Sequence, residues 1–302
     1  MEYHKYIVIA IAGQSNAVGY DESKVEDQEL YFCKNPDRIK QLGFYGEDNL
    51  KVIDLHYCAQ SMQDMRVHNN ADTATPGTKG LHLPLANLML DHIPEDYGVL
   101  MIPIAFGGTA FCANSDGDYD SVLKKPVALG AGEGTVVLKW GKDTAYYRTL
   151  RDRIIHALCL HPENIFGGII WCQGENDAPT SKEHYPAFCE MTQALFASLN
   201  EAGLGSRVTK GVWDKDIWFN METVSYWYTL EGCVEIWNNY RKWNPDTYIE
   251  IPRETPSNEV NGTGQTAQNR GAHFGNNSYA TVIAPRVLAK LLERNTFPVK
   301  KI

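Results

Sequence analysis

A serine lies in the tetrapeptide Gly13-Gln14-Ser15-Asn16, directly behind the apolar run 6–12. An apolar run of this length predicts a buried strand, and a serine among small and polar residues at its end is presented at a sheet edge. An α/β hydrolase needs its nucleophile there, where a hydroxyl can attack a carbonyl carbon. A turn residue or a helix N-cap would also explain a lone serine. The prediction of a nucleophile therefore depends on partners elsewhere in the chain.

Two more glycine-containing polar turns follow apolar runs. Residues 106–111 (FGGTAF) come after the run 98–105, and residues 171–177 (WCQGEND) end the run 166–172. The carboxyl ends of parallel strands meet at one edge of the sheet, where open α/β sheets form their ligand crevice. His273 precedes the last helical segment and could bring an imidazole, the usual general base, to that edge. These segments together predict a site.

The elements that must position these residues alternate along the chain. Apolar runs predict buried strands at 6–12, 98–105, 166–172, 208–213 and 247–251, and helical spacing predicts helices at 81–91, 146–160, 185–199 and 277–292. This alternation predicts an α/β fold, a three-layer α/β/α sandwich with a mostly parallel, flavodoxin-like sheet. We expect a single domain over residues 1–302, with polar rim loops at about 112–140 and 253–270.

Composition excludes several classes of partner. The net charge of -9 and the pI of about 5.5 argue against nucleic acid, which requires clustered Lys and Arg. The apolar run 6–12 is too short for a signal-peptide core or a membrane span, so no membrane partner is expected. The seven cysteines are scattered and include no Cys-x-x-Cys pair. They are expected to be mostly buried, reduced thiols of a cytoplasmic protein.

Taken in order, four blocks resemble those of a known superfamily. The sequences GQSN at 13–16, GGTAF at 107–111, WCQGENDA at 171–178 and the lone His273 resemble the blocks of the SGNH (GDSL-type) hydrolases. The GQSN and QGE forms resemble the sialate O-acetylesterase branch, and within it the bacterial N-acetyl-9-O-acetylneuraminate esterases and their phage-borne relatives. The nearer match also rests on residues 36–42 (PDRIKQL), 63–65 (QDM) and 140–144 (WGKDT). The resemblance covers nearly the whole chain.

The resemblance implies a mechanism. Ser15 would attack the acetyl carbonyl, and His273 would take its proton and return it to the departing sugar hydroxyl. The oxyanion would be met by the Ser15 backbone N–H, a backbone N–H of Gly107 or Gly108, and the side-chain amide of Gln173. No metal or organic cofactor is implied. The implied substrate is an O-acetylated sugar, foremost 9-O-acetylated sialic acid.

One position departs from the superfamily pattern. The aspartate usually found three residues before the histidine is replaced by Arg270. A backbone carbonyl such as that of Gly271 could orient His273 instead, and so could a carboxylate of Glu175 or Asp177. Without any such partner the enzyme would be inactive. Arg270 itself could bind an acidic sugar.

Several other residues are candidates for support or substrate binding. Gln14 and Asn16 flank the nucleophile, and Glu175 could instead cap its own turn through backbone N–H groups. Asp64 could orient the nucleophile loop, contact substrate or make only a loop hydrogen bond. Candidates for binding a sialate carboxylate are Arg38, Arg66, Arg148 and Arg270. The aromatic-rich segment 213–243 could stack on a sugar ring or pack in the core.

The sequence leaves two alternative functions open. The first is a phage tail-associated, tailspike-like deacetylase of O-acetylated bacterial surface polysaccharide. The second is a catalytically inactive sugar-binding module, which the missing aspartate permits. The protein would be cytoplasmic, or virion-associated if phage-encoded, and either a homo-oligomer or attachment to a phage tail is compatible with the sequence.

Overall fold

The computed structural model describes residues 5–23, 28–67, 77–112, 117–120, 125–128, 138–258 and 271–300. The predicted rim loops at 112–140 and 253–270 lie in large part outside these residues. The strands are β1 Lys5–Gly13, β2 Ile39–Leu42, β3 Val52–Asp54, β4 Tyr97–Ala105, β5 Gly117–Asp120, β6 Lys125–Ala128, β7 Ile165–Cys172, β8 Trp218–Met221 and β9 Tyr248–Ile249. The α-helices are α1 Ser15–Val18, α2 His82–Leu90, α3 Ala145–Cys159, α4 Ser181–Glu201, α5 Glu231–Trp243 and α6 Ala284–Glu293.

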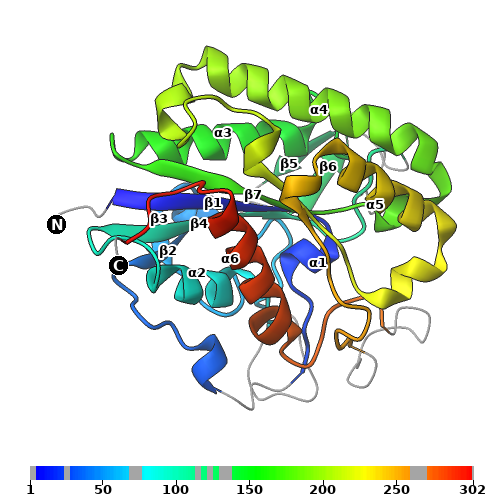
Figure 1. The fold of residues 1–302 in the computed structure, drawn as a ribbon, viewed down its shortest axis with the longest axis horizontal. Helices are drawn as coiled ribbons and strands as arrows, with labels where there is room; N and C mark the ends of the chain where they lie inside the picture. The colour runs from blue at the N-terminus through cyan, green and yellow to red at the C-terminus, as the bar shows by residue number, and fades with distance from the viewer. Residues whose placement is uncertain are drawn as a thin grey trace.

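Seven strands form the central sheet in the order β3-β2-β4-β1-β7-β8-β9 (Figure 1). All neighbouring pairs are parallel except β2 and β3. β1 lies near the centre, where it pairs with β4 on one side and β7 on the other. The three predicted polar turns follow β1, β4 and β7, so they meet at the same edge of three adjacent strands. A separate antiparallel pair is formed by β5 and β6.

Helices cover both faces of the sheet, which confirms the predicted three-layer α/β/α sandwich. Helices α3 and α4 lie on one face, and α2 and α6 lie on the other (Figure 1). Side chains alternate along β1 because successive residues of a strand point to opposite faces. Tyr6, Val8 and Ala10 enter the core under α3 and α4, whereas Ile7 and Ile9 enter the core under α2 and α6.

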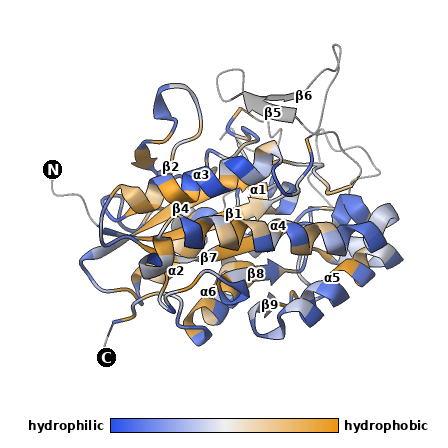
Figure 2. Cartoon of the chain, turned by 90° about the horizontal axis from the view of Figure 1, so that it is seen from above, coloured by the Kyte–Doolittle hydropathy of each residue, from blue (hydrophilic) through white to orange (hydrophobic). Residues whose placement is uncertain are grey.

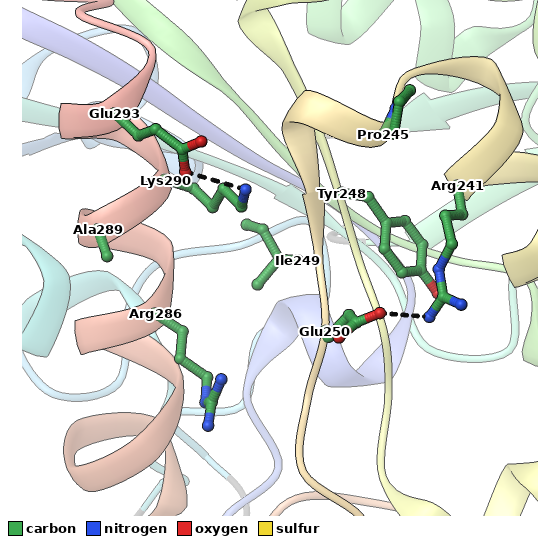
Figure 3. Close-up of a pocket in the computed structure, with 9 residues that line it drawn as sticks. All are labelled: Arg241, Pro245, Tyr248, Ile249, Glu250, Arg286, Ala289, Lys290 and Glu293. Carbon is green, nitrogen blue, oxygen red and sulfur yellow. Dashed lines mark hydrogen bonds and ion pairs between the residues drawn. The ribbon is translucent and has the colours of Figure 1, made fainter.

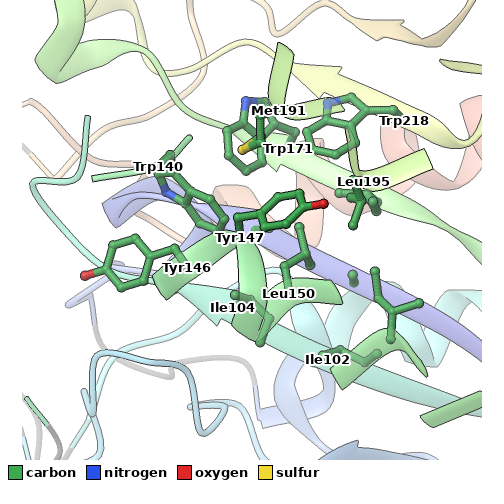
Figure 4. Close-up of a cluster of buried hydrophobic side chains, with 14 of the residues drawn as sticks. Ile102, Ile104, Trp140, Tyr146, Tyr147, Leu150, Trp171, Met191, Leu195 and Trp218 are labelled. Atoms are coloured by element: carbon green, nitrogen blue, oxygen red, sulfur yellow. The ribbon is translucent and has the colours of Figure 1, made fainter. Parts of the chain in front are cut away.

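The core under α3 and α4 is rich in large aromatic side chains. Trp140, Trp171 and Trp218 are fully buried there and pack against aliphatic residues of α3, α4 and β4 (Figure 4). Seen from above, the central strands β4 and β7 carry mainly hydrophobic residues, while α4 and α5 show hydrophilic residues along their surfaces (Figure 2). Burial of both faces explains why β1, β4 and β7 are continuous apolar runs.

The predicted strand 208–213 is wrong. Its residues follow the 3-10 helix Leu204–Arg207 and form turns, in which the Gly211 N–H donates to the Val208 carbonyl at 2.9 Å. Gly211 has a φ of +78°, a conformation that does not continue a strand. The strand that pairs with β7 is β8 instead.

The structure also shows the state of the cysteines and the character of the helices. All seven cysteines are free in the structure. Only Cys58, Cys172 and Cys233 are buried, so the expectation of mostly buried thiols is wrong. Within the described residues, no helix is both long enough and apolar enough to span a membrane.

Candidate active site

Ser15 opens helix α1 immediately beyond the carboxyl end of β1. The preceding Gly13 has a φ of +134°, and a Cβ on it would lie 2.0 Å from the Cys172 carbonyl oxygen. Only glycine allows β1 and β7 to approach this closely while the chain turns. The Gln14 N–H donates to the same Cys172 carbonyl at 3.0 Å. Ser15 is therefore held at the junction of the two strands, with 6% of its surface exposed.

The turn after β4 packs against Ser15. A Cβ on Gly107 would lie 2.7 Å from Gln63 Oε1, 2.9 Å from the Tyr20 hydroxyl oxygen and 3.6 Å from Ser15 Cβ. Gly107 thus leaves room for three side chains to converge. Its N–H donates to Gln63 Oε1 at 2.7 Å. One of the predicted oxyanion donors is therefore occupied by a side-chain carbonyl of the protein in this structure.

Gln173, from the turn after β7, is fully buried and anchored on the turn after β4. Its Nε2 donates to the Thr109 carbonyl at 2.8 Å, and its Oε1 lies 3.2 Å from the Thr109 hydroxyl. The Thr109 hydroxyl also lies 3.0 Å from the Phe106 carbonyl oxygen. Thr109 therefore fixes the Gln173 amide, which keeps a second Nε2 hydrogen for another acceptor.

Asn16 connects the Ser15 turn to the segment that carries His273. Its Nδ2 donates to the Ala272 carbonyl at 3.1 Å, and its Oδ1 accepts from the Phe274 N–H at 3.1 Å. These two bonds flank His273 and also fix the orientation of the amide, because one partner is an acceptor and the other a donor. The structure thus brings the sequence neighbours of Ser15 and His273 together.

The His273 ring is partly buried and stacks on Tyr20. Their ring centroids lie 4.5 Å apart with an interplanar angle of 24°. Burial lowers the pKa of His273 from 6.5 to about 4, because desolvation disfavours the imidazolium ion. The ring is therefore neutral at neutral pH, which is the form that can accept a proton. The preceding Gly271 is buried and has a φ of +82°.

Glu175 contacts Asn16. It is 2% exposed, and its Oε1 accepts from Asn16 Nδ2 at 3.1 Å. The same Nδ2 lies 2.7 Å from the Thr223 hydroxyl, at the carboxyl end of β8. Burial raises the pKa of Glu175, opposed by hydrogen bonds from Asn16 and Thr223. Glu175 is therefore linked to the His273 segment indirectly, through its hydrogen bond with Asn16.

Asp177 lies in a different buried network. Its carboxylate accepts from the Phe111 N–H at 2.8 Å and the Cys112 N–H at 3.1 Å. Its Oδ2 also lies 2.8 Å from His184 Nδ1, and His184 Nε2 lies 2.7 Å from the Tyr240 hydroxyl. Asp177 thus holds the segment that follows the turn after β4, and its role as an alternative partner of His273 stays a prediction.

The remaining supporting candidates are spread around the site. Asp64 forms a bidentate ion pair with Arg66, at 2.8 Å to Nε and 2.8 Å to Nη2. Gln14 is buried, and among the described residues its Oε1 has no hydrogen-bond partner. Arg270 lies outside the described residues. The structure therefore assigns Asp64 a partner and leaves the other two candidates as predictions.

The other candidate arginines lie in different surroundings. The Arg38 guanidinium binds the carbonyls of Pro94 and Tyr97 at the amino end of β4, opposite the sheet edge that carries Ser15. Arg148 lies on α3, where it donates to the Asp143 carbonyl at 2.5 Å. Arg66 lies three residues beyond Gln63 and is partly exposed. Of the described arginines that were candidates, Arg66 is on the loop that reaches Gly107.

The aromatic-rich segment 213–243 is mostly core. Trp213, Trp218 and Trp237 are buried in the cluster under α3 and α4. Two residues border the site instead: the Trp227 indole donates to the Ala272 carbonyl at 2.8 Å, and Tyr226 packs edge-on against Trp227 with centroids 5.1 Å apart. The Tyr226 side chain is exposed. Of the aromatic residues in this segment, Tyr226 and Trp227 are thus the candidates that remain for stacking on a sugar ring.

Four contributors to the site were not predicted as site residues: Tyr20, Gln63, Thr109 and Thr223. Gln63 and Thr109 occur inside sequence blocks that carried the family resemblance, so a local signal existed for them. Tyr20 and Thr223 come from segments without a recognisable motif. Their roles depend on approaches between distant parts of the chain.

A groove lies outside this cluster, between α6 and the edge strand β9 (Figure 3). Its volume is about 470 Å³. Two of its cations have carboxylate partners, since Arg241 pairs with Glu250 at 2.6 Å and Lys290 pairs with Glu293 at 3.0 Å. None of its lining residues belongs to the predicted site. The groove therefore shares no lining residue with the predicted site around Ser15.

Comparison with solved structures defines the class of protein. The crystal structure of NanS superimposes with a TM-score of 0.77 and 25% identity, covering 97% of this chain and 98% of that one. A protein from Arabidopsis thaliana shares the fold with a TM-score of 0.58 at 13% identity, over 95% of this chain and 98% of its own. The chain has the SGNH hydrolase fold and is a carboxylic ester hydrolase.

Sequence comparison identifies the family within this class. The "Probable 9-O-acetyl-N-acetylneuraminic acid deacetylase" of Escherichia coli (strain K12) is 32% identical over 237 residues, which span 74% of this chain and 68% of that protein. The chain belongs to the family of this deacetylase, as the sequence resemblance predicted. No family model matches the chain.

Proposed function

We propose that this protein removes O-acetyl groups from sialic acid, foremost the 9-O-acetyl group of N-acetylneuraminic acid, by a Ser15–His273 mechanism. The supporting observation is the pair of hydrogen bonds by which Asn16 holds the backbone on both sides of His273. These bonds hold the segment that carries the neutral His273 ring against Asn16, the residue that follows Ser15. The E. coli relative supports the substrate, since its name gives it the same acetylated sugar.

The reaction takes two steps. His273 accepts the Ser15 hydroxyl proton as Oγ attacks the acetyl carbonyl carbon. The tetrahedral intermediate collapses, the C–O bond to the sugar breaks, and His273 returns the proton to the departing sugar oxygen. Water then attacks acetyl-Ser15 with His273 again as base, releasing acetate and free Ser15. The lowered pKa of His273 keeps it neutral and ready for the first proton transfer.

The oxyanion would be held by donors at the carboxyl ends of three strands. The Ser15 N–H lies in the first turn of α1, where backbone donors have no intrahelical partner. One Nε2 hydrogen of Gln173 is bound to the Thr109 carbonyl, which orients the second Nε2 hydrogen for the oxyanion. The N–H of Gly107 or Gly108 completes the set, and use of Gly107 requires Gln63 to move away. Such fixed donors stabilise charge as it develops in the transition state.

We assign the Gly271 carbonyl as the acceptor for the His273 Nδ1–H. It would fix the tautomer of the ring in place of the usual aspartate. The hydrogen bonds of both alternative carboxylates support this choice. Glu175 accepts from Asn16, and Asp177 accepts from the backbone at residues 111 and 112. A carbonyl stabilises the imidazolium ion less than a carboxylate does, which an ester substrate tolerates.

The sugar would lie beside the exposed Tyr226 and the Trp227 indole, whose N–H is bound to the Ala272 carbonyl. Apolar faces of sugars pack well on such rings. Arg66, on the loop of Gln63, is the candidate for contact with the sialate carboxylate. We also propose that the enzyme works as one domain in the cytoplasm, which the unpaired state of all seven cysteines supports.

The substrate is tested by measuring acetate release from 9-O-acetylated N-acetylneuraminic acid and from an O-acetylated bacterial polysaccharide, at equal concentrations of acetyl groups. The proposal predicts a higher kcat/KM for the monosaccharide. A preference for the polymer would overturn the substrate assignment in favour of a surface-polysaccharide deacetylase. The comparisons above give no support to a phage-borne origin of that kind.

A further inference from the structure

Tyr20 joins the base and the nucleophile, although no sequence motif marks it. It lies five residues after Ser15, just beyond the end of α1. Its ring stacks on the His273 ring with centroids 4.5 Å apart. Aromatic rings prefer offset-stacked arrangements, so this contact favours the observed relative position of the two rings. The direction in which the Tyr20 hydroxyl emerges is therefore fixed relative to the imidazole.

The backbone reinforces this arrangement. The Asn258 N–H donates to the His273 carbonyl at 2.9 Å, and Asn258 Nδ2 donates to the Tyr20 carbonyl. One residue thus binds the main chain of both ring partners. Tyr20 and His273 are held together at the side chains and at the backbone, which limits the movement of the Tyr20 hydroxyl relative to His273.

The hydroxyl lies next to the nucleophile. The point where a Gly107 Cβ would stand is 2.9 Å from the Tyr20 hydroxyl oxygen and 3.6 Å from Ser15 Cβ. The hydroxyl, the Ser15 side chain and the turn after β4 therefore surround one small volume. A carbonyl attacked by Ser15 must lie in this neighbourhood, because it bonds directly to Oγ.

One backbone donor on this side of the site is already engaged. The Gly107 N–H is already bound to Gln63 Oε1 at 2.7 Å. Burial raises the pKa of Tyr20, so its hydroxyl keeps its proton and remains a donor throughout the neutral range. Gln63 also hydrogen-bonds to the Tyr20 hydroxyl in the sense that opposes this rise in pKa, so Gln63 is the donor and the hydroxyl hydrogen is left for another acceptor.

We propose that the Tyr20 hydroxyl is a catalytic donor that hydrogen-bonds to the oxyanion formed when Ser15 attacks the acetyl carbonyl. The inference rests on the proposed esterase function and adds a residue to it. No proton is transferred: the O–H stays intact and stabilises negative charge on the former carbonyl oxygen. As the tetrahedral intermediate collapses, the same oxygen becomes the carbonyl of acetyl-Ser15 and the hydrogen bond weakens.

The test is Tyr20→Phe, which keeps the ring stacked on His273 and removes only the hydroxyl. Loss of one oxyanion donor lowers kcat by about 100-fold to 1000-fold. We expect a loss of that order on 9-O-acetylated sialic acid, with KM within about twofold of wild type. The matched control is Tyr97→Phe, at the amino end of β4, where the hydroxyl is remote from the catalytic edge. It should retain the wild-type kcat.

A second readout separates catalysis from folding. The rate of Ser15 labelling by a fluorophosphonate should fall in Tyr20→Phe while the thermal unfolding midpoint stays close to wild type, because the phosphonyl oxygen takes the place of the oxyanion. Ser15-dependent turnover that Tyr20→Phe performs at the wild-type kcat would overturn this inference alone. A wild type without Ser15-dependent turnover would overturn the proposed function and this inference with it.

Discussion

The side-chain amide of Asn16 is hydrogen-bonded on both sides of His273, to the Ala272 carbonyl and to the Phe274 N–H, each at 3.1 Å. The residue next to Ser15, the proposed nucleophile, therefore fixes the backbone that carries His273, the proposed base. In a hydrolase without the usual aspartate, this connection supplies alignment that would otherwise come from a carboxylate. The first prediction follows from it.

Asn16→Ala removes both bonds and should lower kcat by about 10-fold to 100-fold, because displacement of a catalytic group by 1 Å can cost about 100-fold. Asn16→Asp should be worse, since a carboxylate oxygen would face the Glu175 Oε1 and the Ala272 carbonyl. Steady-state kinetics with 9-O-acetylated sialic acid, on variants shown to be folded, measures the effect. Wild-type kcat in Asn16→Ala would show that His273 is aligned by other contacts.

Glu175 should act as a hydrogen-bond acceptor for Asn16 and not as the carboxylate partner of His273. Glu175→Gln keeps the Oε1 acceptor and should retain most of the activity, whereas Glu175→Ala removes it and should resemble Asn16→Ala. The kcat values of the two variants test this. Loss of about 1000-fold or more in Glu175→Gln, the scale seen when a triad acid is lost, would instead assign Glu175 to the triad.

Asp177→Asn should affect stability more than chemistry. The carboxylate accepts two backbone N–H groups and contacts His184, all of them inside the protein. Replacing one oxygen by an NH₂ group leaves donors facing one another, at a cost of about 2–4 kcal/mol. Urea unfolding should show a lower midpoint, while the folded variant should keep kcat within about tenfold. A stable variant with a collapsed kcat would contradict this assignment.

The activity should persist well below neutral pH. His273 is active when neutral, and its pKa is lowered from 6.5 to about 4 by burial. The kcat/KM should therefore stay level as pH falls from 7 to about 5, and then drop through about pH 4. An acid limb centred at 6 to 7 in the pH profile of kcat/KM would mean that the ring is more solvated than the structure indicates.

The lowered pKa of His273 also predicts that the free energy of unfolding, like the activity, falls toward acid pH. Between pH 6.5 and about 4 the unfolded chain binds a proton at this position that the folded protein does not. The contribution of His273 to the free energy of unfolding is therefore present above pH 6.5 and is lost as pH falls through this window. Urea unfolding of wild type and His273→Gln at several pH values measures it. As pH falls, the free energy of unfolding of the wild type should decrease relative to that of His273→Gln.

The central part of the fold could be predicted because its strands are buried on both faces. β1, β4 and β7 are continuous apolar runs, and the polar turns at their ends place Ser15 and Gly107 without further information. β8 could not be recognised in this way. It is four residues long and contains Asn220, whose side chain accepts a hydrogen bond from the buried Trp218 indole at 3.0 Å.

The aromatic segment shows a second limit of sequence reasoning. Density of Trp and Tyr does not say which side chains are buried, and α5 carries Trp237 and Tyr240 into the core. Contacts across long separations are equally hidden. Asn16 and Thr223 are 207 residues apart in the chain yet their side chains lie 2.7 Å from each other. No local pattern marks Thr223 or Tyr20, because their roles arise only when the segments meet.

The most direct test of the account is acetate release from 9-O-acetylated N-acetylneuraminic acid by the wild type, Ser15→Ala and His273→Ala at equal concentrations of folded protein. The account predicts steady turnover by the wild type and loss of nearly all of it in both variants. Equal rates in the wild type and Ser15→Ala would contradict the assignment of Ser15 as the nucleophile.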